Sequence, residues 1–121
     1  MVTYEQFYEA LRYALNHLYD PNVQRTSPLA AMLGIHSASS PSLALQQALL
    51  DGISSLERQK DVPANPALRR SYEILLFRYV QQWSQQELAD QLGISPRHLR
   101  REQRAALEIL AQSLCEKYHV S

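Results

Sequence analysis

Hydrophobic residues in the first part of the chain recur every three or four positions, which is the spacing of a helix with one buried face. This pattern predicts a first helix over residues 4–18, capped by Thr3 and ended by Asp20-Pro21, since proline disfavours helical geometry in the residue before it. The predicted buried face consists of Tyr4, Phe7, Tyr8, Leu11, Ala14, Leu15 and Leu18. A short second helix is predicted between the start signal Ser27-Pro28 and the terminator Gly34.

Two longer helices are predicted on either side of a linker with two prolines, residues 60–66. The helix before the linker begins at Ser40-Pro41 and ends near Arg58. Its predicted buried residues are Leu45, Leu49, Ile53 and Leu56. The helix after the linker runs from residue 66 to about Gln82. Its apolar side carries Leu68, Tyr72, Leu75, Leu76 and Tyr79. Every segment has helical period and none alternates with period two, so the predicted fold class is all-α.

The next two helices are joined by a short turn. Ser84 and Glu87 form a capping box that opens a helix over residues 85–92, and Gly93 supplies the left-handed residue that closes it. Ser95-Pro96 begins the following helix, so only about three residues connect the two, and the helices must cross sharply. The residues expected at the crossing are the small Ala89 together with Leu88, Leu92, Ile94 and Leu99. Composition and spacing are those of a helix-turn-helix.

The last helix carries four arginines on one face. Arg97, Arg100, Arg101 and Arg104 lie at i, i+3, i+4 and i+7, so they form a single stripe. The opposite side is apolar and consists of Leu99, Ala106, Leu110 and Leu114. We expect all four guanidinium groups to project into solvent without intramolecular carboxylate partners. An exposed stripe of this kind solubilises a protein or meets a polyanion, and the agreement of turn, cap and phase favours the polyanion.

The two parts of the chain differ in charge, although the chain as a whole has no net charge. The 121 residues include twelve basic and twelve acidic side chains. Residues 1–65 carry four basic and six acidic groups, whereas residues 66–121 carry eight basic and six acidic groups. Seven of the eight basic groups in the second part are arginines between positions 69 and 104. The local arrangement of charge therefore says more about partners than the net value does.

A longer motif connects these elements. The text "RRSYEILLFRYVQQWSQQELADQLGISPRHLRREQRAAL" contains a helix ending in Arg-Tyr-Val, then Ser-x-x-Glu-Leu-Ala-x-x-Leu-Gly-Ile-Ser, then an arginine-bearing helix ending in Ala-Leu. In this motif, residues 66–110 resemble the fourth region of bacterial sigma factors and the related helix-turn-helix domains of response regulators. The resemblance covers somewhat over a third of the chain and is more specific for the fold than for the target.

The resemblance implies a set of DNA-contacting residues. By position, the residues that read bases would be Arg97, His98, Arg100 and Arg101, with Ser95 near a phosphate. Arg104 is expected to contact the DNA backbone. The sequence departs from the family pattern at two places: Glu102 stands where an aliphatic residue is preferred, and Gln82-Trp83 replaces a glycine turn. The first departure concerns the packing of the arginine helix, and the second concerns only the loop.

A short segment in the first half of the chain is similar in sequence to a segment in the second half. "LAAMLGI" at residues 29–35 parallels "LADQLGI" at residues 88–94, and each precedes a helix that begins with Ser-Pro. A diverged internal repeat and chance similarity between short amphipathic helices both explain this. The helix over residues 41–58 has no cation before Arg58, so we assign residues 1–60 to scaffolding, dimerisation or protein contact. Residues 65–121 are predicted to form the helix-turn-helix unit, with the first unit packed on it.

The sequence predicts a bacterial DNA-binding transcriptional regulator, or a DNA-binding module of a larger signalling protein. The arginine helix, residues 96–104, would lie in the major groove of double-stranded DNA. One such helix reads few base pairs, so we expect a homodimer or attachment to a larger chain. The alternative is a protein-interaction module of the same fold that binds RNA polymerase or a signalling partner.

Enzyme chemistry is not expected. The four histidines lie far apart in sequence, and none pairs with Cys115 at the spacing of metal ligands. There is no glycine-rich phosphate loop, so we predict no catalytic residues, metal or cofactor. The single cysteine, the lack of an apolar run of about 20 residues and the lack of a secretory signal predict a cytoplasmic protein without membrane contact.

Overall fold

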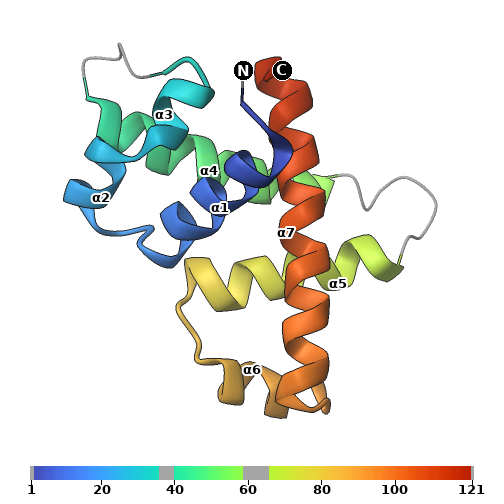
Figure 1. The fold of residues 1–121 in the computed structure, drawn as a ribbon. Helices are drawn as coiled ribbons and strands as arrows, with labels where there is room; N and C mark the ends of the chain where they lie inside the picture. The colour runs from blue at the N-terminus through green and yellow to red at the C-terminus, as the bar shows by residue number, and fades with distance from the viewer. Residues whose placement is uncertain (1, 36–39, 59–65, 121) are drawn as a thin grey trace.

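The computed structural model describes residues 2–35, 40–58 and 66–120, and these residues form an all-helical fold without strands (Figure 1). The elements in chain order are α1 (Tyr4–Asn16), α2 (Pro21–Thr26), α3 (Pro28–Met32), α4 (Pro41–Arg58), α5 (Pro66–Leu75), the π-helical segment η2 (Leu76–Val80), α6 (Gln85–Leu92) and α7 (Pro96–Tyr118). The predicted all-α class is confirmed. Apart from Pro66, the predicted linker 60–66 lies outside the described residues, as does most of the polar loop before α4.

The long helix α7 is the helix against which other parts of the fold pack. Figure 1 shows it running the height of the molecule, with α1–α4 beside its C-terminal half and α6 at its foot. α7 contacts α1, α4, α5 and α6, so one hydrophobic core contains residues from both halves of the chain. The buried stripe of α7 consists of Leu99, Ala106, Leu107, Leu110, Ala111 and Leu114, which confirms the predicted apolar side.

The hydrophobic pattern predicted most of the buried residues correctly. The four leucine and isoleucine positions assigned to α4 are all buried, and so are six of the seven residues on the predicted face of α1. Tyr4 is the exception, with 49% of its surface exposed. It lies in the first turn of α1, where its neighbours are Tyr8, with ring centroids 6.4 Å apart, and side chains of α7 on the outside of the fold.

The end of α1 differs from the sequence prediction. The helix stops at Asn16, and Asp20 caps a further short helix, α2, that the sequence analysis missed. Proline ends a helix but also starts one, because it lacks only an amide that has no partner in the first turn. α2 places Gln24, which is 1% exposed, under the end of α1. There its Nε2 donates to the carbonyls of Ala14 and His17, at 2.9 and 2.7 Å.

The two Leu-Ala-x-x-Leu-Gly-Ile sequences form turns of the same geometry. Gly34 and Gly93 have φ of +75° and +70°, in the left-handed region that favours glycine. The amide of Ile35 donates to the carbonyl of Ala30 at 2.9 Å, and the amide of Ile94 donates to that of Ala89 at 3.0 Å. The likeness between the halves therefore extends from residue types to backbone hydrogen bonds.

The helix that starts at Pro66 widens before it ends. In η2 the amide of Gln81 donates to the carbonyl of Leu76 at 2.9 Å, which is the spacing of a π-helix. Gln82 then takes φ of +61°, and the Trp83 amide donates to the carbonyl of Phe77 at 2.9 Å. The backbone thus has a glycine-like turn where the family resemblance expects glycine, although the residue is glutamine.

Replacing Gln82 with glycine should stabilise the protein. A residue with a Cβ in the left-handed region costs about 1–2 kcal/mol, and glycine removes that cost while adding about 0.5–1 kcal/mol of unfolded-state entropy. We expect Gln82→Gly to raise the free energy of unfolding by up to about 1 kcal/mol in urea denaturation. The control is Gln81→Gly, because Gln81 has φ of −94° and should lose about 0.5–1 kcal/mol. A Gln82→Gly protein no more stable than the control would contradict the prediction.

The capping boxes of α1 and α6 differ in their third helical residue, which is the neutral Gln6 in α1 and the ionisable Glu87 in α6. In α1, Thr3 and Gln6 exchange hydrogen bonds of 3.0 and 3.1 Å. In α6, Ser84 and Glu87 exchange bonds of the same lengths. Hydrogen bonds from the backbone and side chain of Ser84 lower the pKa of Glu87. The charged carboxylate therefore stabilises the folded state above the unfolded pKa, and this contribution is lost as pH falls through the folded pKa.

Glu87→Gln should convert the second box into the type found in α1 and remove its pH dependence. The wild-type protein should lose stability relative to Glu87→Gln as the pH falls from about 5 to about 3, around the usual pKa of a glutamate. Thermal unfolding of the two proteins across this range measures the difference. A stability difference that stays constant with pH would show that the carboxylate of Glu87 does not contribute as its hydrogen bonds indicate.

Candidate nucleic-acid interface

α6 and α7 are joined by the three residues that the sequence predicted. Gly93 caps the end of α6, and the hydroxyl of Ser95 accepts from the backbone N–H of His98 at 3.1 Å, which caps α7. Figure 1 shows α6 lying across the foot of α7. Leu88, Ala89 and Leu99 are fully buried where the helices meet, and Leu92 and Ile94 are half-buried. The first two turns of α7 are therefore fixed by packing on their apolar side.

Three arginines stand on the exposed side of these turns. Arg97, Arg100 and Arg101 are all exposed. Within the part of the chain that the structure describes, none of the three forms an ion pair with a carboxylate or a hydrogen bond with another side chain. For these residues the expected free guanidinium groups are confirmed. We call Arg97, Arg100 and Arg101 the free arginines.

Arg104 differs from the free arginines because its guanidinium group contacts two other side chains. Its Nε lies 3.1 Å from Oε1 of Glu108, one turn further along α7, and its guanidinium lies 4.8 Å from the ring centroid of Tyr8 in α1. The expectation that all four arginines lack carboxylate partners is therefore wrong for Arg104. Proximity to Tyr8, followed by the contact with Glu108, raises the pKa of Arg104, so this residue stays charged. No local pattern indicates the contact with α1, whereas the i+4 spacing of Glu108 is a local signal that the sequence analysis did not use.

Glu102 has a structural role that explains its departure from the family pattern. Its Oε2 lies 3.0 Å from Nη1 of Arg70, so the pair connects α7 with α5. Its Oε1 lies 3.5 Å from Nε2 of His98. His98, which was predicted to read bases, is exposed but lies beside this carboxylate rather than among the free arginines.

The remaining arginines of the second half each have a partner in the protein. Arg69 pairs with Glu73 at 3.3 Å along α5, and Arg70 pairs with Glu102. Arg78 donates to the carbonyl of Trp83 at 3.3 Å and lies 5.7 Å from the ring centroid of Tyr79. The arginines of the second half thus separate into groups that have a partner in the protein, of which Arg70 connects two helices, and the free arginines of α7.

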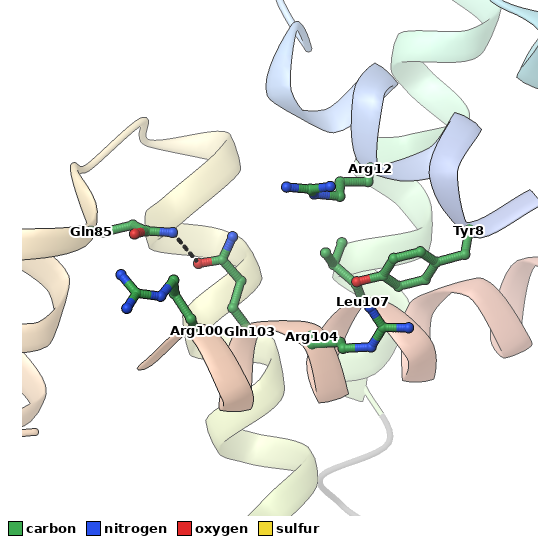
Figure 2. Close-up of a pocket in the computed structure, with 7 residues that line it drawn as sticks. All are labelled: Tyr8, Arg12, Gln85, Arg100, Gln103, Arg104 and Leu107. Atoms are coloured by element: carbon green, nitrogen blue, oxygen red, sulfur yellow. Dashed lines mark hydrogen bonds between the residues drawn. The ribbon is translucent and has the colours of Figure 1, made fainter. Parts of the chain in front are cut away.

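Two residues of α1, Tyr8 and Arg12, lie next to the arginine stripe, although the sequence analysis did not assign them to the candidate site. An open pocket of about 240 Å³ is lined by Tyr8, Arg12, Gln85, Arg100, Gln103, Arg104 and Leu107 (Figure 2). Arg12 and Tyr8 come from the opposite end of the sequence and reach the stripe only because α1 packs against α7. No local pattern in the sequence indicates that proximity.

A metal-binding cluster and a membrane-spanning helix are both absent from the described residues. Across 2–35, 40–58 and 66–120, no three histidine, cysteine, aspartate or glutamate side chains gather in a group that could hold a metal ion. No helix formed by these same residues is both long and apolar enough to pass through a lipid bilayer.

Comparisons with known proteins do not assign the chain to a family. No protein-family model matches it, and searches of curated proteins and of solved structures return no match either. The likeness of residues 66–110 to sigma factor region 4 therefore remains an expectation based on the motif.

Proposed function

We propose that this protein binds double-stranded DNA in transcriptional control, either as a regulator itself or as the DNA-binding module of a larger signalling protein. The first two turns of α7 would lie in the major groove. The observation that carries this proposal is the exposed face formed by Arg97, Arg100 and Arg101, which have no carboxylate partner among the described residues. A face of this kind has unused donors and unneutralised charge, and duplex DNA offers acceptors and negative charge.

Arginine chemistry supports separate roles along the helix. The planar guanidinium fork donates two hydrogen bonds to a guanine edge or to a phosphate, so the free arginines would read bases or fix the register. Arg104, which Glu108 and Tyr8 hold in place, would contact the DNA backbone. The hydroxyl of Ser95 accepts a bond at the start of α7, and its own proton remains available to a phosphate oxygen.

The geometry of the α6–α7 turn supports the same proposal. A buried crossing holds α7 by its apolar side, so its N-terminal turns project from the protein as a rigid element. Rigid presentation lowers the entropy that base contacts would otherwise lose on binding. A single helix reads few base pairs, so we further propose that two copies, or a larger chain, supply a second half-site.

The free arginines should determine both the affinity and its salt dependence. We would select duplexes from a random-sequence library with the full chain and measure their binding by fluorescence anisotropy. Arg100→Ala and Arg101→Ala should each weaken binding by about 1–3 kcal/mol if they read bases, and should flatten the log–log salt slope by about one if they contact phosphate. Arg69→Ala is the matched control, because it removes the same charge from a residue paired with Glu73 on α5.

The absence of duplex binding would contradict this function. If the folded protein binds no duplex at about 50 mM salt, where backbone electrostatics are strong, the free arginines do not serve DNA binding. A protein partner such as RNA polymerase or a signalling protein would then be favoured. Equal effects of Arg69→Ala and Arg101→Ala would indicate that only the overall charge matters.

A further inference from the structure

Among the described residues, those that line the pocket beside the arginine stripe include three arginines and no carboxylate. Arg12 comes from α1, whereas Arg100 and Arg104 come from α7. The other polar groups in its lining are the amides of Gln85 and Gln103 and the hydroxyl of Tyr8, and Leu107 is its apolar member. Figure 2 shows the Arg12 side chain extending from α1 toward the α7 side chains that line the pocket.

The internal ion pairs near the pocket are weak competitors for an incoming anion. Nη1 of Arg12 lies 3.7 Å from Oε2 of Glu9, and the two side chains are 56% and 54% exposed. The pair of Arg104 with Glu108 is similarly exposed, at 56% and 47%. Exposed pairs of this kind contribute about 0–1 kcal/mol, and salt screens them. Arg12 and Arg104 can therefore interact with a phosphate without losing a strong contact.

The walls of the pocket are held in place by buried contacts. The amide of Gln103 donates to the hydroxyl of the buried Tyr79 at 2.6 Å and accepts from Gln85 at 3.4 Å. The ring of Tyr8 and the side chain of Leu107 are buried between α1 and α7. Arg12, Arg100 and Arg104 therefore line a space whose walls are preformed, which lowers the entropy lost when an anion binds.

The position of the pocket along α7 indicates the source of the anion. Arg97 and Arg104 are seven residues apart, so their Cα atoms are separated by about 10 Å along the helix axis. The major groove is about 12 Å wide. When the N-terminal turns of α7 lie in the groove, the pocket at the other end of the stripe lies near the groove's edge, where phosphates line the backbone.

We propose that this pocket binds a backbone phosphate of the duplex whose major groove receives α7, and that Arg12 of the N-terminal half donates to that phosphate. The inference rests on the proposed function and extends it. The N-terminal half then contributes directly to DNA affinity, in addition to packing on α7. The ligand chemistry is a phosphodiester contacted by Arg12 of α1 and by Arg104 of α7, the stripe residue assigned above to the DNA backbone.

The test is the salt dependence of the Arg12→Ala protein. The probe is a short fluorescein-labelled duplex of mixed sequence, titrated with the full chain between about 50 and 200 mM NaCl, since phosphate contacts do not depend on base sequence. Loss of one phosphate contact should flatten the log–log slope by about 0.9. Over this range wild type should therefore lose about 3-fold more affinity than Arg12→Ala.

Two further variants separate the contact from general charge and from folding. Arg25→Ala removes another exposed arginine, one that is bonded to Asn22 in α2 and is outside the pocket, so its salt slope should match wild type. Arg12→Lys keeps the charge and should retain most of the slope, because a lysine contacts phosphate as a point charge. Thermal unfolding of each variant checks that the fold is retained.

Three outcomes would overturn the inference. If Arg12→Ala does not differ in slope from Arg25→Ala while Arg101→Ala, which lies outside the pocket, flattens the slope, DNA binds without the pocket. If pyrophosphate raises the melting temperature of wild type but not of Arg12→Ala while both proteins keep the same duplex slope, the pocket binds a small phosphorylated ligand instead. Failure of wild type to bind any duplex would remove the proposed function together with this inference, whereas the first two results leave that function standing.

Discussion

The packing of α7's apolar stripe is the contact on which the other features of this fold depend. The stripe is buried against elements from both halves of the chain, so α7 cannot rotate about its axis without exposing leucines. Gly52 of α4 lets the helices approach closely, because a Cβ there would lie 3.0 Å from Leu114 and 3.2 Å from Leu110. Fixing the apolar side of α7 also fixes the direction in which its arginines point.

Electrostatics in the second half of the chain follow from this fixed orientation. Arg70 faces α7 and pairs with Glu102, and Arg78 donates to the carbonyl of Trp83 in the loop after η2. On the outer side of α7, Arg104 contacts Glu108 and Tyr8, whereas the free arginines have no carboxylate partner among the described residues. A local surplus of positive charge therefore arises at the start of α7 in a protein with no net charge, because Glu102, the carboxylate nearest to the free arginines along α7, pairs with Arg70 of α5.

The two halves share a turn but differ in the helix that follows it. Gly34 and Gly93 close equivalent turns, and Ala30 and Ala89 are buried at equivalent places. The helix after the second turn carries the free arginines, whereas α4 has no cation before Arg58. If the halves arose by duplication, their backbone geometry persisted while the surface chemistry diverged. The first half supplies packing for α7 and brings Arg12 to the pocket.

Local sequence determined the helices, their caps and the phase of the arginine stripe. Capping residues such as Ser84 and Ser95 act within one turn of the chain, and the glycine at 93 is needed by its own φ, so neither depends on distant parts of the protein. The buried leucines of α4 and α7 were predictable for the same reason, because a 3.6-residue period specifies a face whatever the partner is.

Tertiary structure decided which arginines are free and which residues join them. The pairing of Arg70 with Glu102 and the contact between Arg104 and Tyr8 link positions 32 and 96 residues apart, and no local pattern encodes such distances. The left-handed turn at Gln82 follows the end of η2, where the hydroxyl of Tyr19 donates to the carbonyl of Val80 at 2.6 Å across 61 positions of the chain. Side-chain type and period are local properties, whereas proximity between α1 and α7 arises only when the whole core packs.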